Sequence, residues 1–165
     1  MEVRRGEITD LTAINKMAWE VFPHTYSSIL TKDQIDYMME WMYSLENLEK
    51  QIVNEGHIYF LATEGGKEIG YFSIQQQDVD LFHIQKIYLL PPYQGRGYGK
   101  LLFNEAIAQI HSMHPAPCKI ELNVNRYNKA VEFYHKMGMK IKCSGDFDIG
   151  NGYFMNDYIM TIDVK

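Results

Sequence analysis

Residues 87–105 read IYLLPPYQGRGYGKLLFNE, and this stretch decides the fold around it. A run of apolar and β-favouring residues ends at Pro91 and Pro92, which have no N–H to donate to a sheet. A glycine-rich loop follows, and apolar residues then recur at helical spacing from Leu101 to Ile110. The sequence therefore predicts a strand, a glycine-rich loop and a helix, in that order.

The loop has the chemistry of an anion site. Gly95, Gly97 and Gly99 let successive backbone N–H groups point the same way, and the following helix adds unpaired N–H groups and a positive dipole end. Arg96 and Lys100 add formal positive charge. We expect phosphate as the ligand, with a tight turn that binds nothing as the alternative.

Two common nucleotide-binding loops do not fit this spacing. A P-loop has four residues between its first glycine and the Gly-Lys pair, and then a Ser or Thr that binds magnesium. Here three residues separate Gly95 from Gly99, and Leu101 follows the lysine. The dinucleotide pattern G-x-G-x-x-G also fails, because Lys100 stands where its third glycine would be.

The loop instead resembles the acyl-CoA pyrophosphate loop of the GNAT superfamily of N-acetyltransferases, whose signature is Q/R-x-x-G-x-G/A. The segment from Gln94 to Gly99 matches every fixed position of that signature. The resemblance is strengthened by its context, because the family also requires a strand before the loop and a helix after it.

A second resemblance to the same family lies in residues 125–139, NRYNKAVEFYHKMGM. Asn128, Tyr134 and Gly138 follow the family pattern N-x-x-A-x-x-x-Y-x-x-x-G-F, although Ala130 comes two residues after the asparagine rather than three. By this resemblance residues 1–165 form a single GNAT domain of the α+β class, with a three-layer arrangement. The family fold implies a mixed central sheet of about seven strands with flanking helices, in which two strands splay apart to admit the pantetheine arm.

The elements read along the chain agree with that architecture. Residues 2–5 predict an edge strand, and the first helix is expected to be closed by Pro23. Thr31 and Ser44 are expected to cap the next two helices. From His57 the apolar period changes to two, which predicts three strands leading into the loop. Beyond the loop helix we expect a strand at 119–125, a helix at 128–137 and a final hairpin turning at 150–152.

Composition limits the partners. The chain has 165 residues, 46% of them hydrophobic, which suits one buried core, and its net charge of −5 argues against a nucleic-acid platform. Cys118 and Cys143 have no metal-like spacing and predict no disulfide framework, which favours the cytoplasm. The sequence shows no signal peptide and no apolar run long enough for a membrane span. We therefore expect no metal, nucleic-acid or membrane partner, and the ten methionines leave a homodimer possible.

The resemblance implies which residues hold acetyl-CoA, the expected cosubstrate. Backbone groups of Ile87, Tyr88 and Leu89 would bind the pantetheine and polarise the thioester carbonyl as it becomes tetrahedral. Asn128 would hydrogen-bond the pantetheine arm. The pyrophosphate would lie on the loop residues Gln94, Gly95, Arg96, Gly97, Tyr98, Gly99 and Lys100.

Tyr134 is the candidate general acid, since the family places a tyrosine near the leaving sulfur. A phenol with a pKa of about 10 can protonate a thiolate of somewhat lower basicity when it is held within hydrogen-bond reach. A packed aromatic beside Phe133 on an amphipathic helix is the structural alternative.

A general base is needed because an amine is mostly an ammonium at neutral pH. Some relatives use a glutamate five residues before the motif asparagine, where this chain has Asn123. We name His83 first, for its ordinary pKa of about 6.5, and Glu121 second, on the same strand face as Asn123. His83 and Gln85 are expected on the strand face shared with Ile87. A structural role for the histidine, and proton loss to water, are the alternatives.

The expected acceptor is a small cationic amine. Segments FPHTYSSILTKDQIDYMM and FDIGNGYFMNDYIM resemble the arm and C-terminal hairpin of bacterial diamine and polyamine acetyltransferases. We expect direct attack of a polyamine or diamine on acetyl-CoA in a ternary complex. The acidic and aromatic residues suited to a cation are Tyr26, Glu40, Tyr43, Asp146, Asp148, Tyr153 and Asp157.

Two other functions remain open at this point. The same fold could serve a protein or peptide Nα-acetyltransferase, or a non-catalytic CoA-binding module. A long open groove across the final hairpin would favour a peptide, and a closed acidic pocket would favour a diamine. The acidic side chains could also be ordinary solvated surface charges.

Overall fold

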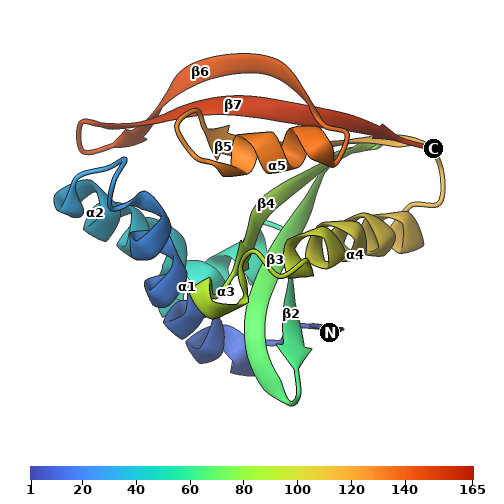
Figure 1. The fold of residues 1–165 in the computed structure, drawn as a ribbon, viewed down its shortest axis with the longest axis horizontal. Helices are drawn as coiled ribbons and strands as arrows, with labels where there is room; N and C mark the ends of the chain where they lie inside the picture. The colour runs from blue at the N-terminus through green and yellow to red at the C-terminus, as the bar shows by residue number, and fades with distance from the viewer.

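The computed structural model describes residues 1–165 and contains a seven-stranded sheet between two layers of helices (Figure 1). The strands lie in the order β1-β2-β3-β4-β5-β7-β6, and every neighbouring pair is antiparallel except β4 and β5. This confirms the α+β class and the mixed seven-stranded sheet. The strands are β1 (Glu2–Arg5), β2 (Ile58–Glu64), β3 (Lys67–Asp78), β4 (Leu81–Leu89), β5 (Cys118–Asn125), β6 (Lys140–Gly150) and β7 (Tyr153–Val164). The α-helices are α1 (Leu11–Tyr26), α2 (Lys32–Tyr43), α3 (Leu45–Asn54), α4 (Tyr98–Met113) and α5 (Ala130–Lys136).

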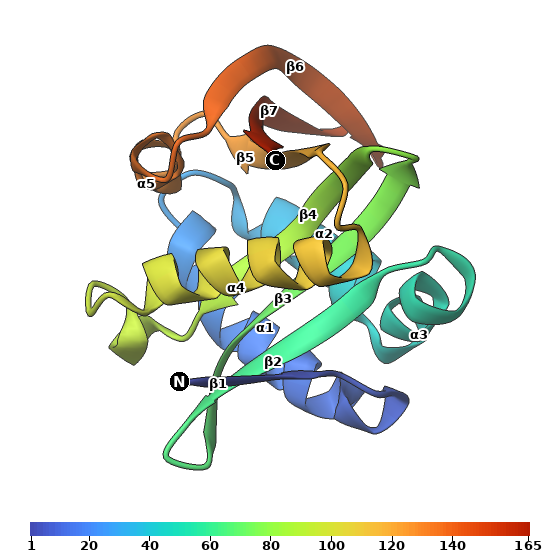
Figure 2. The same ribbon diagram turned by 90° about the vertical axis from the view of Figure 1, so that its right-hand side faces the viewer.

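Each face of the sheet is covered by its own hydrophobic core. One core packs Phe103 of α4 and Tyr134 of α5 against strand residues such as Phe72. The other packs α1, α2 and α3 against alternate strand residues such as Tyr59 and Tyr71. Figure 2 shows α4 in front of the sheet and α1 behind it. The alternation of strand side chains thus places α4, the helix after the glycine loop, on one face and the helical arm on the other.

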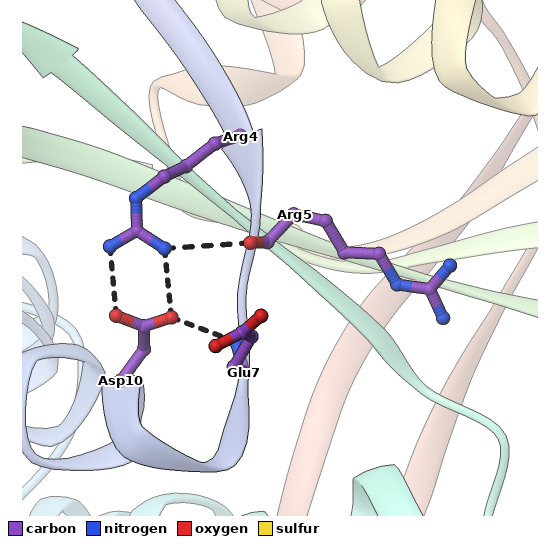
Figure 3. A network of polar contacts seen from close by, with 4 residues as sticks. All are labelled: Arg4, Arg5, Glu7 and Asp10. Atoms are coloured by element: carbon purple, nitrogen blue, oxygen red, sulfur yellow. Dashed lines mark hydrogen bonds and ion pairs between the residues drawn. The ribbon is translucent and has the colours of Figure 1, made fainter.

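A bidentate ion pair connects the edge strand to the start of the arm (Figure 3). The guanidinium of Arg4 donates to Asp10 through Nη1 at 2.9 Å and Nη2 at 2.8 Å. The backbone N–H of Glu7 donates to the same carboxylate at 2.7 Å. The hydrogen bond from Arg4 holds the pKa of Asp10 below its ordinary value. This pair fixes β1 relative to the first arm helix.

The second and third arm helices begin where the sequence predicts. Thr31 Oγ1 accepts a hydrogen bond from the N–H of Gln34 at 3.2 Å, and Ser44 Oγ accepts one from Asn47 at 3.2 Å. These two N-caps set where α2 and α3 begin, so the arm turns at defined residues.

The prediction that Pro23 closes the first helix is wrong, because α1 continues to Tyr26. A proline inside a helix removes one N–H donor but leaves its own carbonyl free to accept. The N–H of Ser27 donates to that carbonyl at 2.9 Å, so the last turn still forms. The additional turn carries Tyr26 to the two cavities described below.

Strand β4 contains a β-bulge at Gln85. Ile74 of β3 pairs with Ile84, whereas the preceding Ser73 pairs with Lys86, so β4 has one additional residue between the two pairs. Before the bulge Ile84 packs in the α4-side core, and after it Ile87 packs against that same core. The bulge therefore reverses the alternation of side chains along β4.

Strands β4 and β5 pair only at their beginnings. The parallel register joins Leu81 to Lys119, Phe82 to Ile120 and His83 to Glu121, and no pairing continues beyond it. The expected splay is confirmed, and one backbone edge of β4 from Ile84 onward has no strand partner.

No helix is both long enough and apolar enough to cross a membrane.

Candidate active site

Two cavities open on either side of the splayed strands. The loop cavity, of about 580 Å³, lies beside the glycine loop and is lined by residues of β4, β5, α4 and α5. The arm cavity, of about 550 Å³, lies between the helical arm and the β6–β7 hairpin. Both are large enough for part of a ligand of cofactor or metabolite size.

The two cavities meet where β4 and β5 separate. Five residues line both of them, and they come from α1, from the bulge region of β4 and from β5. They are Tyr26, Gln85, Lys86, Tyr88 and Asn123. These five residues form the boundary between the two cavities, so ligands bound in them would lie on opposite sides of this junction, and a transfer between two substrates requires such ligands to approach each other.

The glycine loop has the backbone conformation expected of an anion cradle. Gly95 and Gly97 have φ angles of 72° and 87°, which side chains other than glycine rarely adopt, and α4 begins at Tyr98. Gln94 fixes the loop to the sheet by donating from Nε2 to the carbonyl of Leu89 at 2.9 Å. Gln94, Gly95 and Gly99 line the loop cavity, so the N-terminal amides of α4 lie at one end of it.

The two cations of the loop lie at its outer side. The guanidinium carbon of Arg96 is 5.6 Å from the ring centre of Tyr93 and 5.5 Å from that of Tyr98. Arg96 and Lys100 are exposed and do not line the cavity. They add positive charge near the loop without being enclosed by it.

Ile87, Tyr88 and Leu89 line the loop cavity along the unpaired edge of β4. Asn128 lines the same cavity and holds the chain at the start of α5, because its Oδ1 accepts from the N–H of Ala130 at 2.9 Å. The Nδ2 of Asn128 donates to the hydroxyl of Tyr26 at 3.2 Å. This contact joins α1 to the second sequence motif across the junction.

Tyr134 lies in the wall of the loop cavity and packs beside Phe103 and Phe133. Only 7% of its surface is exposed, and burial raises the pKa of its phenol above the ordinary value. The phenol is therefore protonated near neutral pH, which is the state that a proton donor must have.

The two sequence candidates for the base lie in different settings. His83 lines the arm cavity, and burial lowers its pKa while the charge of Glu121 opposes that shift. Glu121 lines neither cavity, and its Oε2 accepts from the ammonium of Lys142 at 2.8 Å. The expectation that His83 shares a face with Ile87 is wrong, because the bulge at Gln85 lies between them.

Only some of the candidate substrate residues reach the cavities. Tyr26 lines both, and Asp148 and Asp157 line the arm cavity. The other four lie elsewhere: Glu40 is exposed on α2, Tyr43 is 0% exposed in the core, Asp146 pairs with Arg126 at 2.8 Å, and Tyr153 packs on Tyr37 with ring centres 5.2 Å apart.

Lys86 is a buried cation at the junction that sequence reasoning did not single out. Its ammonium donates to Gln51 Oε1 at 2.8 Å and to the carbonyl of Met42 at 3.2 Å, and it also donates to the hydroxyl of Tyr59. The ammonium lies 4.4 Å from the ring centre of Tyr43. Burial lowers the pKa of Lys86 to about 7. A lone lysine in an apolar strand has no sequence pattern that predicts these partners.

Asp157 is the most enclosed carboxylate of the arm cavity. It is 1% exposed on β7, and its Oδ2 accepts from the Nδ2 of Asn123 at 3.3 Å. Burial raises the pKa of Asp157 to about 6, while the hydrogen bond from Asn123 and the charge of Arg126 act in the opposite direction. The sequence marked it only as one of several hairpin acids.

Comparison with known proteins agrees with this geometry. Residues 27–152 match the family model described as an acetyltransferase (GNAT) domain. An uncharacterized N-acetyltransferase of Mycobacterium tuberculosis is 25% identical over 155 residues, which cover 93% of this chain and 97% of the relative. A spermidine N(1)-acetyltransferase of Thermoplasma acidophilum is 27% identical over 146 residues, which cover 86% of this chain and 89% of the relative.

A solved structure gives the same result in three dimensions. The PaiA N-acetyltransferase of Thermoplasma acidophilum, crystallised in complex with coenzyme A, superposes with a TM-score of 0.80 at 26% identity. The superposition covers 99% of this chain and 98% of that structure. The glycine loop, the splayed strands and the family match lead to one conclusion: the chain belongs to the GNAT family of acetyltransferases and is an N-acetyltransferase.

Proposed function

We propose that this enzyme transfers the acetyl group of acetyl-CoA to a primary amine of a small polyamine or diamine, by direct attack in a ternary complex. The observation that carries the proposal is the junction, where Tyr26, Gln85 and Asn123 line both cavities. A thioester extending from the loop cavity and an amine in the arm cavity would meet there. Two similar proteins support the same pair of substrates: one is named a spermidine N(1)-acetyltransferase, and the other was crystallised with coenzyme A.

The loop cavity has the groups that acetyl-CoA requires. The amides at the start of α4, with Gly95 and Gly97 in their left-handed conformation, would bind the pyrophosphate. The backbone of Ile87–Leu89 would bind the pantetheine and the thioester carbonyl along the unpaired edge of β4. Tyr134, in the wall of that cavity, would protonate the departing thiolate.

The arm cavity supports a cationic acceptor. It is lined by three carboxylates, those of Glu55, Asp148 and Asp157, and by the aromatic residues Tyr26 and Tyr88. Two lysines also line it: Lys50 is exposed, and the ammonium of Lys86 donates to Gln51, Met42 and Tyr59. A diamine or polyamine could place one amine at the junction and a second near an outer carboxylate.

The test is a thiol-release assay with acetyl-CoA and separate panels of polyamines, amino acids, aminoglycosides and peptides with a free N-terminus. Saturable turnover with a polyamine or diamine is the expected result. Turnover confined to peptides would replace the acceptor class with a peptide Nα-amine. Absence of turnover with every panel would overturn the proposed acceptor and leave CoA binding alone to be measured.

A further inference from the structure

We infer that Asp157 is the catalytic residue that binds the acceptor ammonium and takes its proton before attack. This inference rests on the proposed function, because it assigns a role to a side chain in the amine cavity. It replaces His83 and Glu121, the candidates that sequence reasoning named, with a carboxylate on β7.

The position of Asp157 favours it over the other acids. It lines the arm cavity and hydrogen-bonds Asn123 at 3.3 Å, and Asn123 in turn lines both cavities. One hydrogen bond therefore separates this carboxylate from the junction. Glu121 is two residues before Asn123 but lines neither cavity and is paired with Lys142. Asp148 lines the arm cavity, yet its Oδ1 accepts from the N–H of Gly150 in the hairpin turn at 2.8 Å.

The charge state of Asp157 is suited to proton transfer. The carboxylate has no ion-pair partner in the chain, because Arg126, the cation that influences it, is engaged with Asp146 at 2.8 Å. An acceptor ammonium would supply the missing positive charge. With a pKa near 6 the carboxylate is ionised at neutral pH but is a stronger base than an exposed aspartate.

The neighbouring charges do not supply a competing partner. The other titratable groups that line the same cavity come from α1, from α3 and the segment after it, from β4 and from β6, and none of them forms an ion pair with Asp157. They are Tyr26, Lys50, Glu55, His57, His83, Lys86, Tyr88 and Asp148. Burial keeps the phenols of Tyr26 and Tyr88 protonated by raising the pKa of each, and Lys86 already donates to three other groups.

Proton transfer to Asp157 precedes bond formation at the thioester. The ammonium transfers one proton to the Asp157 carboxylate, and the freed nitrogen lone pair forms a bond to the thioester carbonyl carbon. The C–S bond then breaks and its electron pair leaves with the sulfur of CoA, which receives a proton from Tyr134. The nitrogen, now bonded to the acetyl carbon, loses one more proton to solvent, and the Tyr134 phenolate takes a proton from solvent. Asp157 releases the proton that it accepted to water. The net products are the acetylated amine, CoA thiol and one proton.

The experiment compares pH profiles of kcat/KM in wild type, Asp157→Asn, Asp157→Glu and His83→Gln, from about pH 5 to about pH 9.5, with the best amine of the panels. Asp157→Asn should lower kcat/KM for the amine about 100-fold or more at neutral pH and remove the acid limb near pH 6. Its deficit should shrink as the pH approaches the pKa of the amine, since the free amine then needs no base. Asp157→Glu should recover part of the rate, and the KM for acetyl-CoA should not change.

Asp163→Asn is the matched control, because Asp163 is an exposed aspartate on the same strand and lies outside both cavities. It should keep the wild-type profile. An Asp157→Asn enzyme with the wild-type rate and acid limb would overturn the inference alone. If the acid limb of the kcat/KM profile disappears in His83→Gln and remains in Asp157→Asn, the base is His83 instead. A wild type that acetylates no amine would overturn the proposed function, and this inference with it.

Discussion

Replacing Asp157 with asparagine should stabilise the fold even though it should lower activity. The carboxylate is 1% exposed, and burial raises its pKa from the ordinary 3.8 to about 6. The folded protein therefore binds this proton more tightly than the unfolded chain does. The stability that this group contributes is full below about pH 4 and is lost as the pH rises through about 6. Asparagine has nearly the same shape and no charge, so it avoids the loss.

The magnitude follows from the shift. A difference of about two pKa units, at about 1.4 kcal/mol per unit, corresponds to about 3 kcal/mol at pH 7.5, where both states of the wild type are ionised. At about pH 4.5 the folded carboxyl is already protonated and the unfolded one is partly so, which reduces the difference to about 1 kcal/mol. For a chain of 165 residues the larger value corresponds to a rise in Tm of about 6–12 °C.

The assay is urea unfolding of wild type and Asp157→Asn at both pH values, followed by circular dichroism and tyrosine or tryptophan fluorescence. The expected result is a gain at about pH 7.5 that is about three times the gain at about pH 4.5. The control Asp163→Asn removes an exposed aspartate paired with Lys119 and should leave the unfolding free energy nearly unchanged. A lower unfolding free energy of Asp157→Asn at the higher pH, or the same gain in unfolding free energy at both pH values, would refute the assignment of Asp157 as a desolvated carboxylate.

Three further predictions concern other parts of the site. Tyr134→Phe should lower kcat by about 100-fold, with little change in the KM for the amine, because it removes the proposed proton donor and keeps the packed ring. An unchanged kcat would exclude Tyr134 as the proton donor. Gly97→Ala should raise the KM for acetyl-CoA several-fold, because a φ of 87° costs a residue with a side chain about 1–2 kcal/mol. A KM equal to that of the wild type would mean that the pyrophosphate binds elsewhere. Lys86→Met should maintain or raise thermal stability near neutral pH. The groups around the ammonium keep their other hydrogen bonds, because Gln51 Oε1 still accepts from the Tyr59 hydroxyl and the Met42 carbonyl still accepts from Gln51 Nε2. A fall in Tm of more than a few degrees would contradict this prediction.

Local sequence determined the glycine-loop side of the site. The glycines, the prolines before them and the helix after them act over a few residues, so backbone preference alone predicts a strand, a left-handed loop and an exposed helix N-terminus. The helix caps at Thr31 and Ser44 are equally local and were confirmed. The second motif around Asn128 added to the family resemblance of the loop, and the match over residues 27–152 confirmed the family.

The amine side was decided by tertiary structure. The bulge at Gln85 depends on the register between two strands, and it changes which side chains of β4 face the junction. The additional turn of α1 past Pro23 brings Tyr26 within 3.2 Å of Asn128, a residue 102 positions away in sequence. Short sequence patterns cannot report such contacts, because each depends on where a distant segment packs.

The acids of the final hairpin show the same division. By sequence Asp146, Asp148 and Asp157 are equivalent, since all three are aspartates in strands with alternating polarity. In the fold Asp146 is paired with Arg126 at the surface, whereas Asp157 is buried beside Asn123. The sequence by itself determined the family, the conformation of the glycine loop and the order of the elements. Only the tertiary structure decided which carboxylate is desolvated beside the junction, because desolvation is a property of the surroundings and not of the residue.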